Sequence, residues 1–308
     1  MNASAGRAAG NQAPGGTGCE PLPAGAGHSG SAAHPGSAAP EAGGAPLVRL
    51  AAASGVATVT LSRPSMHNAL VPEMLLDLCV ALETAGRRED VRCLLLQADG
   101  ADFSIGPDLR RLAREMSGPG MQAYAAELAG LLNQAMLTLM RLSQPVVARV
   151  HGRVEGLALG LVLAADVVIA GEDARFTAGQ PGAGLAPAGG WTALLPRLAG
   201  ARRAGAGLML AREIGALEAR DWGIVTEFLP CGGLQAHAAA AARRIAQASP
   251  AAMRNAKRTL LGDLDDAEAA LEAERLRFVE ATCEAEARER VERFLRANPA
   301  YPDEGPAA

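Results

Sequence analysis

A turn of small residues at His151–Gly156 places backbone groups where they can bind a negatively charged atom. The turn follows an apolar, β-prone run, Val146–Val150, and precedes an apolar helix-like run, Leu157–Ala165. A helix that begins directly after a glycine leaves its first backbone N–H groups without intrahelical acceptors. Those groups and the positive end of the helix dipole can hold an anion, or a carbonyl oxygen that becomes one. The segment is therefore a candidate oxyanion hole, although strand–turn–helix units are often purely structural.

The elements around this turn follow from the spacing of apolar residues. Short apolar runs predict strands at Val56–Leu61, Val91–Gln97 and Val167–Ala170. Helical spacing predicts helices at Pro72–Glu83 and Gln122–Leu142. One further short strand is predicted at Ile224–Leu229. Helical spacing also predicts a run of helices in the C-terminal part of the chain, at Ala199–Leu210, Leu217–Trp222, Gly233–Gln247, Ala251–Leu261, Asp266–Glu280 and Ala285–Arg296.

Composition limits the class of protein. The chain has 308 residues, 49% of them hydrophobic, which is enough for a sizeable core in one or two domains. Aromatic residues make up only 3% of the chain, so the core must be built from Leu, Val and Ala. The net charge of −4 argues against a nucleic-acid-binding surface. We expect no membrane span, because Asp166 interrupts the longest apolar run.

The cysteines and histidines are scattered along the chain. Five cysteines form no CxxC motif and no even-numbered framework, which indicates a reduced, cytoplasmic setting. The five histidines are equally dispersed, so no metal site is predicted.

The two ends of the chain differ in composition from its middle. Residues 1–46 are rich in Ala, Gly, Pro and Ser without apolar periodicity, which predicts a disordered tail rather than a signal or transit peptide. A core is predicted over residues 47–248 and a C-terminal helical region over residues 249–301. Residues 302–308 are predicted to be a frayed tail.

The segment that starts at Pro145 resembles the crotonase family, also called the enoyl-CoA hydratase/isomerase family. The similarity extends from about Val56 to Tyr301 and is carried by the order and spacing of Pro145, Val146, His151-Gly152, Gly156, Ala164-Ala165-Asp166, Ile169-Ala170, Glu172-Asp173-Ala174-Arg175-Phe176, Gly184-Leu185, Pro187, Gly189-Gly190 and Leu195-Pro196-Arg197-Leu198. The resemblance implies an α/β fold, a crotonase-like spiral of repeated ββα units with a C-terminal helical region. It also implies an acyl-CoA ligand, with coenzyme A as part of the substrate and no permanently bound cofactor, and assembly into homotrimers or dimers of trimers.

The resemblance assigns the oxyanion hole to two backbone positions. One is the N–H of Leu157, which directly follows Gly156; Gly156 itself is expected to contact the CoA ester. The other position falls on Pro107, and proline has no N–H to donate. Losing one donor from such a hole typically costs a few kcal/mol of transition-state stabilisation. Asp108 is interpreted as the N-cap of a helix that begins at Leu109 rather than as an acid.

The resemblance also implies contacts with coenzyme A. The loop that contains Phe103, Ile105 and Gly106 is expected to lay its backbone against the adenine. Arg63 is expected either to meet a CoA phosphate or to be a solvated residue at a strand end. Arg110 is expected either to meet a phosphate or to lie on a solvated helix face.

The acidic positions are the main departure from the family. Its hydratases place one glutamate a turn into the helix and a second in the loop after the next strand, and the pair handles water and a proton. Those positions fall here on Gly160 and Gln180, and a position that is aspartate in some isomerases falls on Ala188. Glu155 is the carboxylate nearest to the turn, and it is either a substitute acid or a solvated turn residue. His151 is interpreted as a hydrogen-bonded structural residue.

Two classes of function remain open. The first is an enzyme of the hydratase/isomerase type, a lyase or an isomerase, which acts on an enoyl-CoA thioester through the oxyanion hole without the usual glutamates. The alternative is a catalytically impaired acyl-CoA-binding or structural paralogue of the family. Turnover of crotonyl-CoA, measured together with binding of a CoA ester, discriminates between them.

Overall fold

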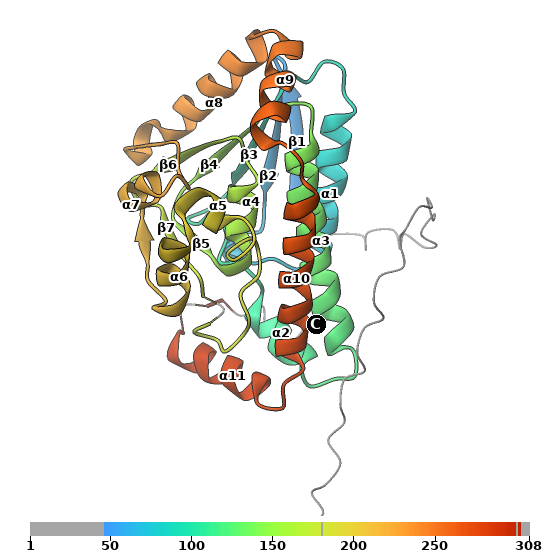
Figure 1. Ribbon diagram of the computed structural model, residues 1–308, viewed down its shortest axis with the longest axis vertical. Coiled ribbons are helices and arrows are strands. Elements are labelled where there is room, and N and C mark those ends of the chain that lie inside the picture. Colours follow the sequence, from blue (N-terminus) through green and yellow to red (C-terminus); the bar gives the residue numbers. More distant parts are fainter. Residues whose placement is uncertain (1–45, 180, 300, 303–308) are drawn as a thin grey trace, which may run out of the picture. The chain divides into compact units, whose positions relative to one another are not determined.

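The computed structural model describes residues 46–302 except residues 180 and 300, and a main sheet of six strands runs through this part of the chain (Figure 1). The strand order is β1-β2-β3-β4-β6-β9. The β1–β2 pair is antiparallel, and the other neighbours are parallel. The strand bounds are β1 Val48–Ala53, β2 Val56–Leu61, β3 Cys93–Ala98, β4 Val146–Val150, β6 Val167–Gly171 and β9 Glu227–Leu229.

A second, three-stranded sheet carries the turn of interest. It consists of β5 (Arg153–Glu155), β7 (Arg175–Thr177) and β8 (Ile214–Gly215), in the order β5-β7-β8. The β5–β7 pair is parallel, with Glu155 opposite Thr177. The short 3₁₀ turn η2 (Gly156–Ala158) and helix α4 (Leu159–Leu163) follow β5 directly.

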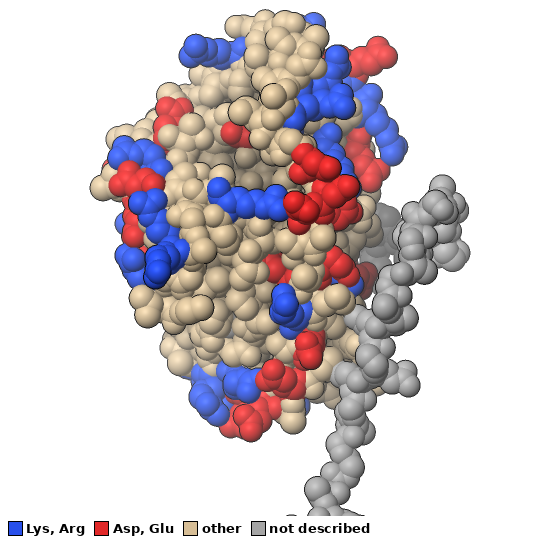
Figure 2. All heavy atoms as spheres, in the orientation of Figure 1, with Lys and Arg blue, Asp and Glu red and all other residues tan. Residues whose placement is uncertain are grey.

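Helices cover both faces of the main sheet. They are α1 Pro72–Gly86, α2 Leu109–Glu115, α3 Met121–Arg141, α5 Leu195–Ala199, α6 Ala201–Met209, α7 Ala216–Asp221, α8 Cys231–Gln247, α9 Pro250–Leu261, α10 Asp265–Thr282 and α11 Ala287–Ala297, together with the 3₁₀ turn η1 at Pro64–Met66. The long helices α3 and α10 lie side by side, and α11 packs beside α2 (Figure 1). On the face drawn in Figure 2, acidic and basic side chains are mixed over a largely uncharged surface.

Strand β4 separates two hydrophobic cores, because successive side chains of a strand point to opposite faces. Val146, Ala148 and Val150 belong to the larger core, which includes α3 and α4. Val147 belongs to a smaller core that α8 covers. The two faces of this one strand therefore meet two different environments.

The predicted strands and helices are confirmed, with shifts of a few residues at their ends. Strands β1, β5, β7 and β8 lie outside the predicted ranges. The second half of β1 consists of three exposed alanines, which give no alternation of apolar and polar residues to indicate its pairing with β2. The turn predicted at His151–Gly156 contains strand β5, which forms because β7 supplies the pairing partner. The helix predicted at Leu157–Ala165 is divided into η2 and α4. The predicted N-terminal tail, apart from Pro46, and residues 303–308 lie outside the described residues.

Candidate functional site

The turn after β5 leaves one backbone N–H group without an acceptor inside the turn. Gly156 opens η2 with φ of +53°, a left-handed conformation that glycine adopts without steric cost. Leu157 is fully buried and stands second in η2, so its N–H has no acceptor within the turn. Trp191 Nε1–H donates to the Gly156 carbonyl at 2.9 Å, which fixes the orientation of the turn. The N–H predicted as a donor is thus held in a rigid, water-poor setting.

Two glycines allow other segments to approach this turn closely. A Cβ at Gly189 would lie 2.6 Å from the Leu157 carbonyl oxygen, and Gly189 has φ of +76°. A Cβ at Gly106 would lie 2.4 Å from the Glu155 carbonyl oxygen and 3.4 Å from the Leu157 nitrogen. The loop that contains Pro107 therefore passes directly against the turn that contains Leu157, as a two-sided oxyanion hole requires.

The two N–H groups on either side of Pro107 are already bonded within the chain. The Asp108 N–H donates to the Leu70 carbonyl at 3.0 Å. The Gly106 N–H donates to Ser104 Oγ at 3.2 Å. Either group would have to break a buried hydrogen bond before it could serve a substrate oxygen.

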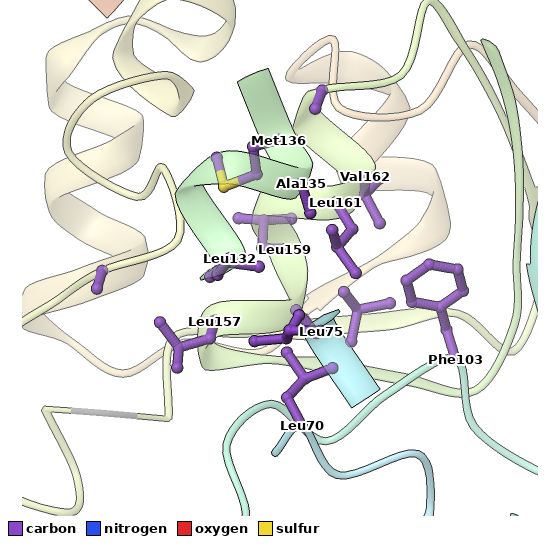
Figure 3. Close-up of a cluster of buried hydrophobic side chains, with 14 of the residues drawn as sticks. Leu70, Leu75, Phe103, Leu132, Ala135, Met136, Leu157, Leu159, Leu161 and Val162 are labelled. Carbon is purple, nitrogen blue, oxygen red and sulfur yellow. The ribbon is translucent and has the colours of Figure 1, made fainter. Parts of the chain in front are cut away.

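The position predicted for the first family glutamate is occupied in part by Met136, whose thioether would have to move to admit a side chain. A Cβ at Gly160 would lie 2.5 Å from Met136 Sδ and 2.9 Å from Met136 Cε. Met136 comes from α3 and packs with Leu132 and Leu159 above the turn (Figure 3). Ala188, the third such position, is buried, and Gln180 lies outside the described residues.

Glu155 is a paired, half-buried carboxylate rather than a solvated turn residue. Its side chain is 14% exposed, and its Oε1 lies 3.8 Å from Arg153 Nη1. The Tyr301 hydroxyl donates a hydrogen bond to its Oε2, and Tyr301 packs edge-on against Phe294 with ring centroids 5.5 Å apart. Burial raises the pKa of Glu155, although the bond from Tyr301 and the charge of Arg153 oppose that rise. A carboxyl group with a raised pKa is better suited to exchange protons near neutral pH.

The two arginines predicted near CoA phosphates make bonds within the chain. Arg63 is 7% exposed, so its alternative as a solvated strand-end residue is wrong. Its Nη2 lies 3.1 Å from Asp108 Oδ2, and its Nη1–H donates to the Ala69 carbonyl. Arg110 donates to the carbonyls of Tyr301 and Pro302, at 3.0 and 2.9 Å. Phosphate binding by either side chain stays a prediction.

The loop at residues 103–108 is described by its packing and by the helix that it caps. Asp108 caps α2 and accepts from the Arg111 N–H at 2.9 Å, which confirms its role as an N-cap. The side chains of Phe103 and Ile105 are buried in the larger core, so only their backbone remains for an adenine contact. Beside Pro107 lies a hollow of about 10 Å³, whose lining includes Tyr301 and Pro302.

Two buried carboxylates near the site were not predicted. Asp102 bonds His67 Nδ1 at 2.6 Å and Arg153 Nη2 at 2.9 Å. Glu274 on α10 is 3% exposed and accepts from the N–H groups of Gly190 and Ala193 at 2.8 and 2.9 Å. Glu274 lies in a helix crowded with other acidic residues, so no sequence signal marks it as buried.

His151 is hydrogen-bonded as predicted, with Nε2 2.9 Å from the Gly100 carbonyl oxygen. The described residues contain no group of three or more His, Cys, Asp or Glu side chains able to hold a metal ion. Within the same residues, no helix combines the length and the apolar character needed to cross a bilayer.

Known proteins are similar to this chain over nearly all of its described residues. The sequence pattern of the family described as enoyl-CoA hydratase/isomerase matches residues 51–303. A Rhodobacter capsulatus protein named "Probable enoyl-CoA hydratase" is 35% identical over 257 residues, which is 82% of this chain and 96% of the relative. The 1,2-epoxyphenylacetyl-CoA isomerase of Escherichia coli is 34% identical over 171 residues, 56% of this chain and 65% of the relative.

A solved structure gives the same result. The crystal structure of an enoyl-CoA hydratase/isomerase from Pseudoalteromonas atlantica superimposes with a TM-score of 0.72 at 27% identity and covers 82% of this chain and 97% of its own. The predicted crotonase-like α/β fold is therefore confirmed. The matched pattern spans both the turn at Leu157 and the C-terminal helices. The chain belongs to the enoyl-CoA hydratase/isomerase (crotonase) family.

Proposed function

We propose that this protein is an enzyme that acts on an enoyl-CoA thioester, with the thioester carbonyl oxygen bound by the Leu157 N–H. The turn supports this proposal because it holds that donor rigidly, and the glycine loop at Gly106 lies against it. Preorganised donors at a developing oxyanion are usually the largest single contribution to this kind of catalysis. Coenzyme A enters as part of the substrate, and no resident cofactor is needed.

Double-bond isomerisation is the reaction that the side chains support best. Hydration in this family uses two carboxylates, and their positions in this chain are Gly160 and Gln180, neither of which carries one. The aspartate position of some isomerases, Ala188, also lacks an acid, so the proton carrier must come from elsewhere in the chain. Isomerisation needs a single proton carrier. In a 3-enoyl thioester, the Glu155 carboxylate takes a proton from C2, the dienolate oxygen accepts from Leu157 N–H, and Glu155 returns the proton to C4. No other reactant is consumed.

The observation that carries this proposal is the environment of Glu155. Burial raises its pKa, the Tyr301 hydroxyl orients its carboxylate, and its own backbone touches the loop of the hole. A carboxyl group with a raised pKa, two residues before a backbone donor in the chain, can act as a proton shuttle.

The test follows conversion of 3-enoyl-CoA to 2-enoyl-CoA by ultraviolet absorbance. Glu155→Gln is expected to lower kcat about 100-fold or more, with little change in KM. In the unmodified enzyme the rate should rise with pH as Glu155 deprotonates, and this rise should vanish in the variant. Glu172→Gln, a change to an exposed glutamate, is the matched control and should leave the rate unchanged. An unchanged rate in Glu155→Gln would exclude Glu155 as the shuttle.

A second candidate function, a non-catalytic acyl-CoA-binding paralogue, is favoured by Pro107 and by Met136 in the space beside Gly160. Calorimetric binding of crotonyl-CoA without turnover of any enoyl-CoA in a broad panel would support it over the enzyme. Absence of both binding and turnover would favour a structural subunit. Assembly into homotrimers or dimers of trimers is part of the proposal and is measured by light scattering with size exclusion. The cytoplasmic location also stays a prediction.

A further inference from the structure

A polar pocket of about 470 Å³ opens on the opposite face of the main sheet from the turn at Leu157. It lies at the carboxyl ends of β3, β4 and β6, where the first turn of α8 meets the sheet, and its walls include Gln97, Asp99, Arg149, His151, Asp173 and Cys231. The crevice outside the carboxyl ends of parallel strands is the usual place for ligands in open α/β sheets.

Three polar atoms in the wall of this pocket lack partners. Gln97 Oε1, Arg149 Nε and His151 Nδ1 are buried and have no hydrogen-bond partner among the described residues. Only five side-chain atoms in the described part of the chain share this condition, and three of them line this pocket. A buried polar group left unpaired costs about 1–3 kcal/mol, so native proteins keep few of them. Their clustering makes the wall of this pocket the least well paired polar region in the described part of the chain.

The strand geometry explains how these atoms come together. Arg149 and His151 are two residues apart at the end of β4, so they project to the same face of the sheet. Gln97 lies on the neighbouring strand β3, next to the pair Leu96 and Ala148. Val147, on the same face as Arg149, packs under α8. The pocket therefore begins where the apolar cover of α8 ends.

Each unpaired atom has a defined hydrogen-bonding role. His151 Nε2 faces the Gly100 carbonyl at 2.9 Å, and because a carbonyl only accepts, Nε2 carries a hydrogen. In the tautomer whose one hydrogen is on Nε2, His151 Nδ1 is an acceptor. Gln97 Oε1 is a second acceptor, and Arg149 Nε–H is a donor.

The walls of the pocket hold one guanidinium, that of Arg149, and two carboxylates, those of Asp99 and Asp173. The guanidinium donates to the Ala98 carbonyl at 2.8 Å, and among the described residues it forms no ion pair. Asp99 is already paired with Arg49 and accepts from Ser62 Oγ at 3.0 Å, and Asp173 accepts from the Gly152 N–H at 3.3 Å. Burial lowers the pKa of Arg149, with the charge of Asp99 only partly opposing it. A carboxylate would supply the missing counter-charge.

We propose that this pocket is a second ligand site, which binds a small carboxylate that also carries an amino or hydroxyl group. The carboxylate accepts from Arg149 Nε–H, and the amino or hydroxyl group donates to His151 Nδ1 and Gln97 Oε1. The site is separate from the thioester site and does not depend on its chemistry.

Cys231 provides a reporter for this proposal, because it is exposed and lines the pocket, whereas Cys79 and Cys93 are buried. In a Cys19→Ser, Cys283→Ser background, the protein is equilibrated with four small thiols as their disulfides: L-cysteine, mercaptoacetate, 2-mercaptoethanol and cysteamine. Intact-mass spectrometry measures the mixed disulfide formed with each. The hydrogen bond to Asp173 raises the pKa of the Cys231 thiol, so equilibrium yields are compared rather than rates.

L-Cysteine is expected to exceed 2-mercaptoethanol about tenfold at Cys231, as one well-made charge-assisted bond would give. Arg149→Met should make the yields with L-cysteine and 2-mercaptoethanol equal. L-Cysteine is also expected to exceed mercaptoacetate, which has no amino group, and Gln97→Leu should remove that difference. As a control, a protein that keeps Cys283 and carries Cys231→Ser shows how much mixed disulfide each thiol forms at a cysteine outside the pocket. Equal yields at the two cysteines, or a preference for cysteamine at Cys231, would overturn the proposal.

Discussion

Two candidate sites lie on opposite faces of one sheet, and they differ in how completely their buried side chains are hydrogen-bonded. Around the turn at Leu157, the buried carboxylates of Glu155, Asp102 and Glu274 all have partners. In the pocket under α8, Gln97 Oε1 and two neighbouring side-chain atoms have none among the described residues. Paired groups fix the shape of a backbone, whereas unpaired ones mark where binding energy can still be gained.

The difference follows from what each site presents. The thioester site offers backbone N–H groups, so the surrounding side chains serve to hold loops and turns in place. The pocket under α8 offers side chains themselves, on a strand face that the small core leaves uncovered beyond Val147. Changes to side chains should therefore cost stability on the first face and cost little on the second.

The largest expected loss comes from Glu274→Ala. It removes the acceptor of the Gly190 and Ala193 N–H groups and of the Thr192 hydroxyl, which lies 2.6 Å away. Because each buried donor left unpaired costs about 1–3 kcal/mol, we expect a loss of about 4 kcal/mol in the free energy of unfolding. Urea denaturation measures it.

Glu272→Ala, two residues away on the same helix, is the matched control. Glu272 is exposed and, within the described ranges, pairs with the half-buried Arg275 one turn away, so its removal should cost no more than about 0.5 kcal/mol. Similar losses in the two variants would contradict the view that Glu274 holds the loop against Leu157.

The next effect concerns the space beside Gly160. Gly160→Glu would place a Cβ 2.5 Å from Met136 Sδ and is expected to cost about 3 kcal/mol through overpacking. Combining it with Met136→Ala should recover part of that loss, and a double-mutant cycle should give a favourable interaction of about 1 kcal/mol or more. Gly205→Glu, where a new Cβ meets nothing within 4 Å, should be close to neutral. Additive losses would show that Met136 does not exclude a carboxylate.

The sequence allowed much of the fold to be predicted because its signals are local. Apolar spacing located β4, α3 and the turn that carries Leu157, and the N-cap preference located the start of α2 at Leu109. Strand β5 could not be found in this way, because three residues of mixed polarity become a strand only when β7 lies beside them.

The side-chain partners of the site were harder to predict, because they are far apart in sequence. Glu155 looks like a turn residue until Tyr301, 146 residues later, is placed against it. Glu274 looks like one of many helix-surface acids until Gly190 meets it. Tertiary pairing decides both, and no local periodicity contains that information.

A pH-dependent effect is expected from Asp102→Asn. Burial alone would raise the pKa of Asp102, but hydrogen bonds and charge from Arg153, with the bond from His67, lower it below 3.8. The charged form therefore stabilises the fold above pH 3.8, and that contribution disappears as pH falls through the lowered pKa. We expect a loss of about 1–2 kcal/mol at pH 7 that shrinks toward zero in acid, measured by urea denaturation across pH 2.5–7. A loss that stays constant with pH would show that shape, not charge, is what Asp102 supplies.

The smallest effect should come from the unpaired pocket. Gln97→Leu gives up one bond, from Gln97 Nε2 to Thr60 Oγ1 at 3.1 Å, and removes the unpaired Oε1 from a buried wall. Because replacing an incompletely paired buried amide with an apolar group of similar size is nearly neutral, we expect a change within about 0.5 kcal/mol in either direction. Urea denaturation without added ligand measures it. A loss above about 1.5 kcal/mol would mean that the Gln97 amide is fully paired in the free protein, and the contrast between the two faces of the sheet would no longer hold.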